Sequence, residues 1–162
     1  MTRHDEQGRV QVFGWKEHIE LPEWDLRLRA KLDTGARSSA LHVTALEELG
    51  DHVDAATGRR LPVVRFDVVL GSKHAPEHHE VEAPIVGHKV VRDTGARAET
   101  RPVVRTRIVC GPLDTVADIT LTDRTGMNFR MLLGRLTLEH HALVDPAHGY
   151  VVTRKKPTAR RP

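Results

Sequence analysis

Cysteine, aromatic residues and long apolar runs are all scarce in this chain of 162 residues. Cys110 is the single cysteine, which excludes a disulfide within the chain and fits a reducing compartment. No apolar run approaches the roughly 18 residues that a membrane span needs, and the opening residues MTRHDEQGRV contain no apolar leader. We therefore expect a cytoplasmic protein with no membrane partner.

The aromatic residues are three Phe, two Trp and one Tyr. Proteins that bind single-stranded nucleic acid commonly stack its bases on aromatic rings, so this scarcity argues against nucleic acid as a partner. The formal net charge is +3, and the last ten residues, TRKKPTARRP, include five Lys or Arg. We interpret 153–162 as a basic disordered tail, 1–11 as an N-terminal arm and 12–152 as one compact domain.

The body of the chain is patterned as short strands. Residues 26–32, LRLRAKL, alternate apolar and basic side chains without a miss, which is the period of a strand with one buried face. Similar short runs, separated by Gly, Pro and Asp, cover 61–70, 82–91, 101–110, 117–123 and 129–134. The pattern predicts an all-β barrel or sandwich. Short helices are expected at 44–50 and 136–143, and a mobile loop at 71–80.

The pentapeptide DTGAR occurs twice, at 33–37 and at 93–97. Asp-Thr-Gly is an ordinary turn, and it is also the turn on which aspartic peptidases present a catalytic carboxylate. Glycine after Asp-Thr allows a tight turn and a close backbone approach. Two such carboxylates a few ångströms apart share one proton, so that one activates water while the other protonates the substrate carbonyl. This chemistry needs no metal.

The strand that enters Asp33 and the later run MLLGR at 131–135 together resemble retropepsins, the homodimeric aspartic peptidases typified by retroviral proteases. Four segments extend the resemblance to the bacterial family named ATP-dependent zinc proteases, which is regarded as retropepsin-like: 12–42, 101–104, 119–135 and 143–146. The resemblance implies an all-β, retropepsin-like (acid protease) closed barrel with one or two short helices.

The same resemblance assigns the site residues. It implies that Asp33, Thr34 and Gly35 form the catalytic turn of an aspartic endopeptidase acting on a protein or peptide substrate. Substrate-binding positions would be Ala36, Arg37, Gly95, Arg97 and Arg135. Ser38 and Ser39 follow the turn and are expected to hydrogen-bond it.

The family's name points to zinc and ATP, whereas the residues do not. No HExxH motif is present, and the adjacent histidines at 78–79 and at 140–141 would point to opposite faces of a strand. No GxxxxGK[ST] phosphate loop is present either. We therefore predict no metal and no cofactor, and keep a zinc-dependent protease as an alternative.

The second DTGAR copy falls where the resemblance places the flap, the hairpin that closes over substrate. Gly95 would then serve a turn, Asp93 would be a turn residue, and Asp33 alone would be catalytic. The second carboxylate would come from another copy of the chain in a twofold homodimer. The alternative is a dyad of Asp33 and Asp93 within one chain.

One departure from retropepsins bears on the substrate. Arg37 stands where an acidic residue usually follows DTGA, so two guanidinium groups, Arg37 and Arg135, would lie beside the cleft. Arginines near the expected flap would add to this positive field: Arg92, Arg97, Arg101 and Arg105. Some members of the resembled family occur beside glutamate ligases that append glutamate to a ribosomal protein, which also favours acidic or glutamate-rich substrates.

Two alternatives to that interpretation remain open. The arginines could instead pair with neighbouring Asp and Glu on outward strand faces. The whole domain could also be a non-catalytic β-barrel module that binds an acidic protein or nucleic acid, although such a module has no need of the DTGA and LLGR motifs.

Overall fold

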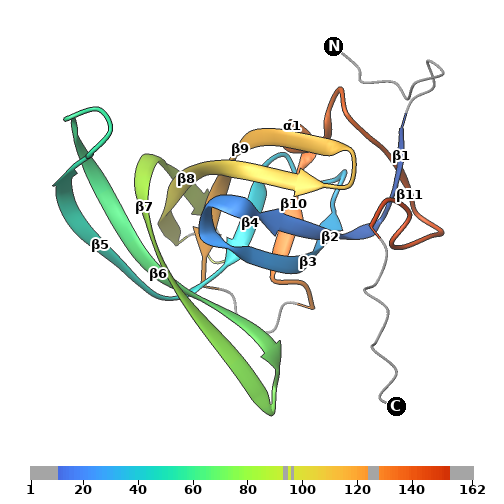
Figure 1. The fold of residues 1–162 in the computed structure, drawn as a ribbon, viewed down its shortest axis with the longest axis horizontal. Coiled ribbons are helices and arrows are strands. Elements are labelled where there is room, and N and C mark those ends of the chain that lie inside the picture. Colours follow the sequence, from blue (N-terminus) through green and yellow to red (C-terminus); the bar gives the residue numbers. More distant parts are fainter. Residues whose placement is uncertain (1–10, 93–94, 96, 124–127, 154–162) are drawn as a thin grey trace.

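The computed structural model describes residues 11–92, 95, 97–123 and 128–153, so the predicted N-terminal arm and basic tail lie almost wholly outside the described residues. Strands dominate (Figure 1). They are β1 (Val12–Gly14), β2 (Lys16–Leu21), β3 (Leu26–Leu32), β4 (Ser39–His42), β5 (Thr44–Val53), β6 (Arg60–Ser72), β7 (Ala75–Arg92), β8 (Ala98–Cys110), β9 (Leu113–Thr122), β10 (Met131–Leu133) and β11 (Leu143–Asp145). Two short helices complete the described part: η1, a 3-10 turn (Pro22–Trp24), and α1 (Arg135–Leu138).

Six of the strands close into a barrel. The order β2-β3-β10-β4-β9-β8 closes on itself because Glu20 of β2 pairs with Val109 of β8. β3 and β10 run parallel, as do β4 and β9. The predicted all-β closed barrel with one or two short helices is therefore confirmed. None of the helices in the described residues has the length and apolar character to span a membrane.

β3 shows how the sequence pattern builds the barrel. Its four apolar residues, Leu26, Leu28, Ala30 and Leu32, are buried in the core, and its three basic residues are exposed. The apolar side chains point inward at every second position, so a shift of one residue would turn them towards solvent. The alternation therefore fixes the register in which the strand pairs with its neighbours. Cys110, at the end of β8, is also buried.

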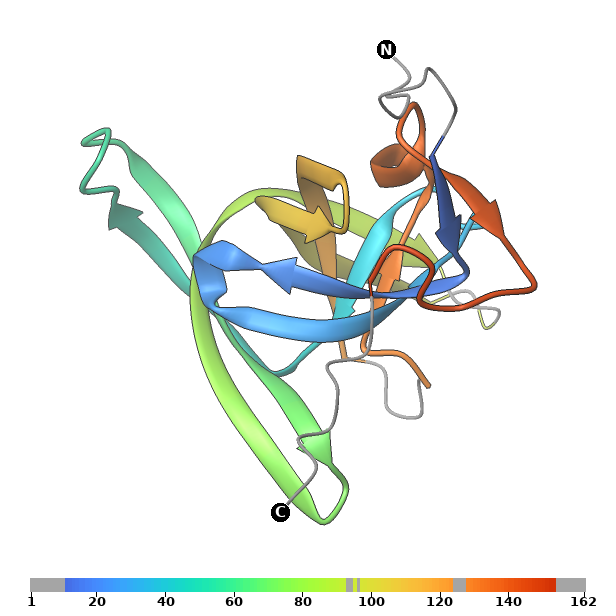
Figure 2. The same ribbon diagram turned by 45° about the vertical axis from the view of Figure 1, so that its right-hand side comes forward.

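Strands β5, β6 and the first half of β7 leave the barrel as an antiparallel extension (Figures 1 and 2). The predicted mobile loop at 71–80 is wrong, because β6 and β7 stay paired as far as Ser72 and Ala75. Both faces of this end of the hairpin are exposed to solvent. Its polar residues therefore pair as strands without the alternation of apolar and polar side chains that marks a strand with one buried face. Trp24 of η1 packs edge-on against Phe66 of β6, with 5.5 Å between the ring centroids, and this contact anchors the extension to the barrel.

The helix predicted at 44–50 is also wrong. These residues lie in β5, which pairs with β6 through two register shifts. Ala45 and Gly50 have positive φ angles of 50° and 78°, which bend the strand at those shifts and are incompatible with a right-handed helix. The helix expected at 136–143 exists only as the single turn of α1, since His140 adopts a φ of 66° and ends helical geometry.

The C-terminal segment is tied back onto the start of the domain, beside β1 (Figure 1). β11 pairs in parallel with β1. Val152 and Thr153, which follow β11, are held by Glu17 of β2. The carboxylate of Glu17 is fully buried and accepts hydrogen bonds from the main-chain N–H groups of both residues. Thr153, assigned above to the tail, is therefore part of the folded domain, and 154–162 lie outside the described residues.

Candidate active site

Asp33 lies on the turn that follows β3, with its carboxylate held by the backbone. Its Oδ1 accepts hydrogen bonds from the main-chain N–H groups of Gly35 at 3.0 Å and Ala36 at 3.2 Å. Its Oδ2 lies 4.0 Å from Nζ of Lys31, and the side chain is 26% exposed. One carboxylate oxygen is thus fixed by the turn, while the group remains open to solvent.

The turn is braced by the segment after β10. The main-chain N–H of Arg135 donates to the carbonyl of Ala36 at 2.8 Å, and that of Leu136 donates to the carbonyl of Arg37 at 3.1 Å. A Cβ on Gly134 would lie 2.5 Å from the carbonyl group of Ser38, so only glycine allows this approach. The structure therefore brings together the DTGA and LLGR motifs.

Two buried hydroxyl groups lock this junction. Ser39 Oγ accepts a hydrogen bond from the main-chain N–H of Gly134 at 3.1 Å and lies 2.6 Å from Thr137 Oγ1. Both side chains are buried. Ser39 thus acts on the bracing segment rather than on the Asp33 turn itself, which refines the expectation that it would bond the turn.

Thr34 and Gly35 lie on the exposed side of the turn. Within the residues that the structure describes, the hydroxyl of Thr34 makes no hydrogen bond. Lys31 is a neighbour of Asp33 that sequence reasoning missed, although its position two residues before Asp33 on an alternating strand places both side chains on one face.

The backbones of Arg37 and Arg135 belong to the two segments that brace each other. Both residues are exposed. In the described part of the chain, neither guanidinium group has a carboxylate partner. The two arginines therefore remain available to an anion.

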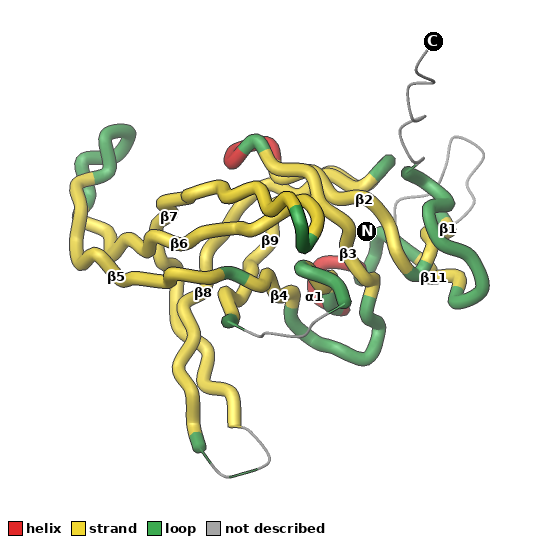
Figure 3. The backbone as a smooth tube through the Cα atoms, turned by 90° about the horizontal axis from the view of Figure 1, so that it is seen from below, coloured by secondary structure: helices red, strands yellow, loops and turns green. Residues whose placement is uncertain are grey.

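The expected flap is the end of the β7–β8 hairpin. Arg92 pairs with Ala98, so Gly95 and Arg97 lie in the connection between the strands, whereas Asp93 lies outside the described residues. The two strands project from the barrel as a narrow arm (Figure 3). Lys89 of this hairpin donates a hydrogen bond from Nζ to Ser38 Oγ at 2.9 Å, which joins the arm to the residue after Arg37.

Two arginines assigned above to the positive field are instead neutralised. Arg101 pairs with Glu99 at 2.9 Å, and Arg105 pairs with Asp118 at 2.8 Å. The hydrogen bond to Asp118 raises the pKa of Arg105 above its usual range. For these two residues, pairing with neighbouring acids is the correct interpretation.

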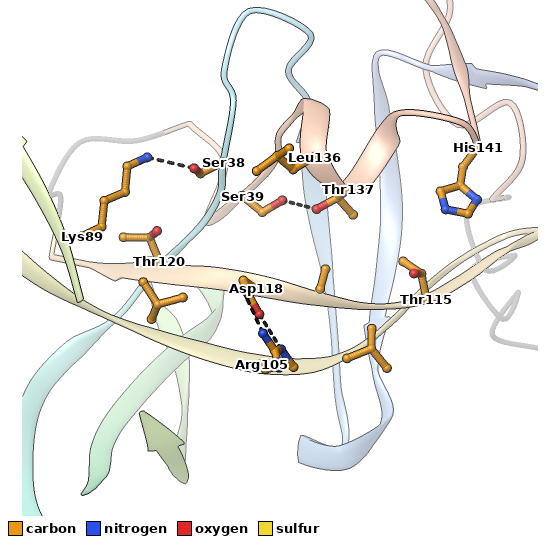
Figure 4. Close-up of a pocket in the computed structure, with 13 residues that line it drawn as sticks. Ser38, Ser39, Lys89, Arg105, Thr115, Asp118, Thr120, Leu136, Thr137 and His141 are labelled. Atoms are coloured by element: carbon orange, nitrogen blue, oxygen red, sulfur yellow. Dashed lines mark hydrogen bonds and ion pairs between the residues drawn. The ribbon is translucent and has the colours of Figure 1, made fainter. Parts of the chain in front are cut away.

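A cavity of about 540 Å³ lies next to the segments that follow Arg37 and Arg135, although no residue from 33 to 37 lines it (Figure 4). Ser38 and Ser39 line it from the end of the turn, and Leu136 and Thr137 line it from α1. Lys89, Arg105 and Asp118 supply its charged side chains. Among the described residues, no three His, Cys, Asp or Glu side chains are grouped in a way that could hold a metal ion.

The closed barrel and the Asp33 turn braced by Gly134 and Arg135 define a retropepsin-like fold. A family model described as "RimB-like: Retropepsin-like aspartic endopeptidase RimB" matches residues 12–155. The chain belongs to this RimB-like family, which confirms the retropepsin-like resemblance.

Comparisons with individual proteins give two kinds of relative. A crystal structure of Lpg0085 from Legionella pneumophila subsp. pneumophila str. Philadelphia 1, described as a protein with unknown function (DUF785), has a TM-score of 0.68 and 29% identity. The match covers 88% of this chain and 98% of that one. This likeness supports the fold and carries no activity with it.

Curated relatives are named "Probable alpha-L-glutamate ligase". The one from Parasynechococcus marenigrum (strain WH8102) is 32% identical over 139 residues, and the one from Desulfotalea psychrophila (strain LSv54 / DSM 12343) is 26% identical over 141 residues. Each match covers 85% of this chain but 28% of the relative. The chain therefore spans less than a third of the length of these curated relatives.

Proposed function

We propose that this protein is an aspartic endopeptidase whose catalytic carboxylate is Asp33. The observation that carries the proposal is the fixed Asp33 carboxylate, held by the N–H groups of Gly35 and Ala36 on a turn that the Gly134–Arg135 segment braces. A rigid, solvent-accessible carboxylate of this kind suits general acid and base catalysis. The buried cysteine fits the reducing cytoplasm as the place where the enzyme acts.

The second carboxylate comes from Asp33 of a second copy in a twofold homodimer. The exposed position of Thr34 and Gly35 supports this arrangement, because the turn is open on the side where a partner's turn would meet it. Two facing carboxylates share one proton. The ionised one takes a proton from water, whose oxygen attacks the peptide carbonyl, while the other donates its proton to the carbonyl oxygen. The carboxyl group that took the proton from water then gives it to the amide nitrogen, the C–N bond breaks, and the other carboxylate regains a proton from the tetrahedral intermediate, which becomes the acid product.

The substrate is an acidic or glutamate-rich protein segment. Arg37 and Arg135 support this choice, since their backbones belong to the two bracing segments and their side chains lack carboxylate partners among the described residues. Two adjacent guanidinium groups repel each other unless an anion joins them. The names of the curated relatives point in the same direction, because a peptidase related in sequence to glutamate ligases would meet glutamate-rich chains.

A peptide digest tests this proposal. Wild-type protein, Asp33→Asn and Asp93→Asn are incubated with a mixed peptide pool containing Glu-rich members, with and without a chelator, and products are identified by mass spectrometry. We expect chelator-resistant cleavage that Asp33→Asn reduces by at least about 10²-fold, since this substitution removes the acid–base group. Asp93→Asn is the matched control and should retain activity.

The other outcomes discriminate among the alternatives. Equal loss in Asp93→Asn and Asp33→Asn, with both variants folded, would favour a dyad within one chain. Chelator-sensitive cleavage would favour a zinc-dependent protease. No cleavage under any condition would favour a barrel that binds an acidic partner without cutting it.

A further inference from the structure

The cavity lined by Ser38, Ser39 and α1 carries one charge that is not neutralised within the described residues. Arg105 and Asp118 cancel each other through hydrogen bonds of 2.8 and 3.4 Å. Lys89 also lines the cavity, but its Nζ donates to a neutral partner, Ser38 Oγ, at 2.9 Å. No carboxylate in the described part of the chain pairs with it.

Lys89 joins the β7–β8 hairpin to the segment that follows the Asp33 turn. It pairs in register with Arg101 across the β7–β8 hairpin, and its ammonium group reaches Ser38, which follows Arg37 at the end of the Asp33 turn. Figure 4 shows Lys89 and Ser38 at one end of the cavity and His141 at the other. The ammonium group therefore links the hairpin arm to the segment that follows the candidate catalytic turn.

The remaining walls suit a short aliphatic chain with a polar end. Val103, Val116 and Leu136 offer apolar surface, and Thr115 and Thr120 add hydroxyl groups. A carboxylate that leaves water for such a cavity needs a cation or several donors to compensate for its lost hydration. A glutamate side chain, with two methylene groups and a terminal carboxylate, meets both requirements.

We propose that Lys89 is a specificity-determining residue that receives a glutamate side chain of the substrate in this cavity. Ser38 holds the ammonium group in place before substrate arrives, and the incoming carboxylate forms a charge-assisted hydrogen bond with it. This inference rests on the proposed function and deepens it, since it assigns one glutamate to a particular cavity distinct from the Arg37–Arg135 pair.

The test compares two matched peptides, one Glu-rich and one with Gln in place of every Glu. The variants are Lys89→Met, Lys89→Arg and, as a matched control, Lys73→Met. Lys73 is exposed on the β6–β7 connection, so its loss changes the net charge equally at a site away from the cavity. We expect Lys89→Met to lower kcat/KM for the Glu-rich peptide roughly tenfold and to change that for the Gln peptide less than about twofold. Lys89→Arg should retain most of the preference, and Lys73→Met all of it.

A binding measurement separates this inference from the peptidase proposal. Binding of the labelled Glu-rich peptide is followed by fluorescence anisotropy with two proteins, the Asp33→Asn variant and the double variant Asp33→Asn, Lys89→Met. The measurement does not require either protein to cleave the peptide. Roughly tenfold weaker binding in the second variant supports the role of Lys89, even if the wild-type protein cleaves nothing. Equal binding, or an equal loss of kcat/KM for both peptides in Lys89→Met, overturns the role of Lys89 while leaving the Asp33 proposal intact.

Discussion

The main-chain N–H of Asp33 donates to the carbonyl of Leu133 at 2.8 Å. This bond continues the parallel pairing of β3 with β10 and joins the first residue of the DTGA turn to the end of the LLGR strand. The position of the candidate catalytic carboxylate therefore depends on residues far along the chain, and it is the brace rather than the turn alone that holds it.

Loss of the Ser39 hydroxyl should weaken this brace. Ser39→Ala leaves the Gly134 N–H and the Thr137 hydroxyl without their buried partner, which we expect to cost about 1–3 kcal/mol of the free energy of unfolding. Urea denaturation measures this change. Thr137→Ala and the double variant complete a cycle, and a coupling free energy near zero would mean that the two hydroxyl groups do not act together.

The homodimer proposal makes peptidase activity depend on protein concentration. Below the dimer dissociation constant, specific activity should fall in proportion to the remaining dimer, which dilution assays and analytical ultracentrifugation can follow together. An equimolar mixture of wild-type protein and Asp33→Asn should show about a quarter of the wild-type activity if the copies assort at random, and about a half if each chain works alone. The second value would refute a shared dyad.

The buried carboxylate of Glu17 should stabilise the closure of the C-terminal segment. Glu17→Gln replaces one acceptor oxygen with an amide group that faces the donors of Val152 and Thr153, and we expect a loss of about 1–3 kcal/mol in the free energy of unfolding. Glu20→Gln on the same strand is the matched control, because Glu20 is 54% exposed and should change stability by less than about 0.5 kcal/mol. Equal effects in both variants would contradict a specific role for Glu17.

Cys110 should be unreactive in the folded protein. Burial, with a smaller contribution from the negative charge of Glu17, raises the pKa of the Cys110 thiol from 9.0 to about 12. The pKa of the thiol is higher in the folded than in the unfolded protein. The free energy of unfolding should therefore fall as pH rises from 9.0 towards about 12, and it should not depend on this group at lower pH. Iodoacetamide at about pH 8 should label Cys110 in urea and leave the native protein unmodified, as mass spectrometry would show. Rapid labelling of native protein would contradict its burial.

The sequence predicted the strand β3 of the barrel correctly but not the strands of the extension. The alternation of residues 26–32 predicted β3 and its buried face correctly, because a barrel strand has one face in the core and one in water. At 71–80 the strands face water on both sides, so no alternation exists to reveal them. At 44–50 the local helical propensity of Ala, Leu and Glu was overruled by pairing with β6, which no local pattern encodes.

The candidate site divides in the same way. By itself, the sequence determined the all-β class, because strand alternation is written in contiguous residues, and its resemblance to retropepsins identified the closed barrel, the Asp33 turn and the LLGR counterpart. Only the tertiary structure decided which charges near the site are neutralised, since Arg105 meets Asp118 across two strands while Lys89 meets the neutral Ser38 from another part of the chain. Such pairings depend on strand register and closure of the barrel, which bring together side chains that no local pattern connects.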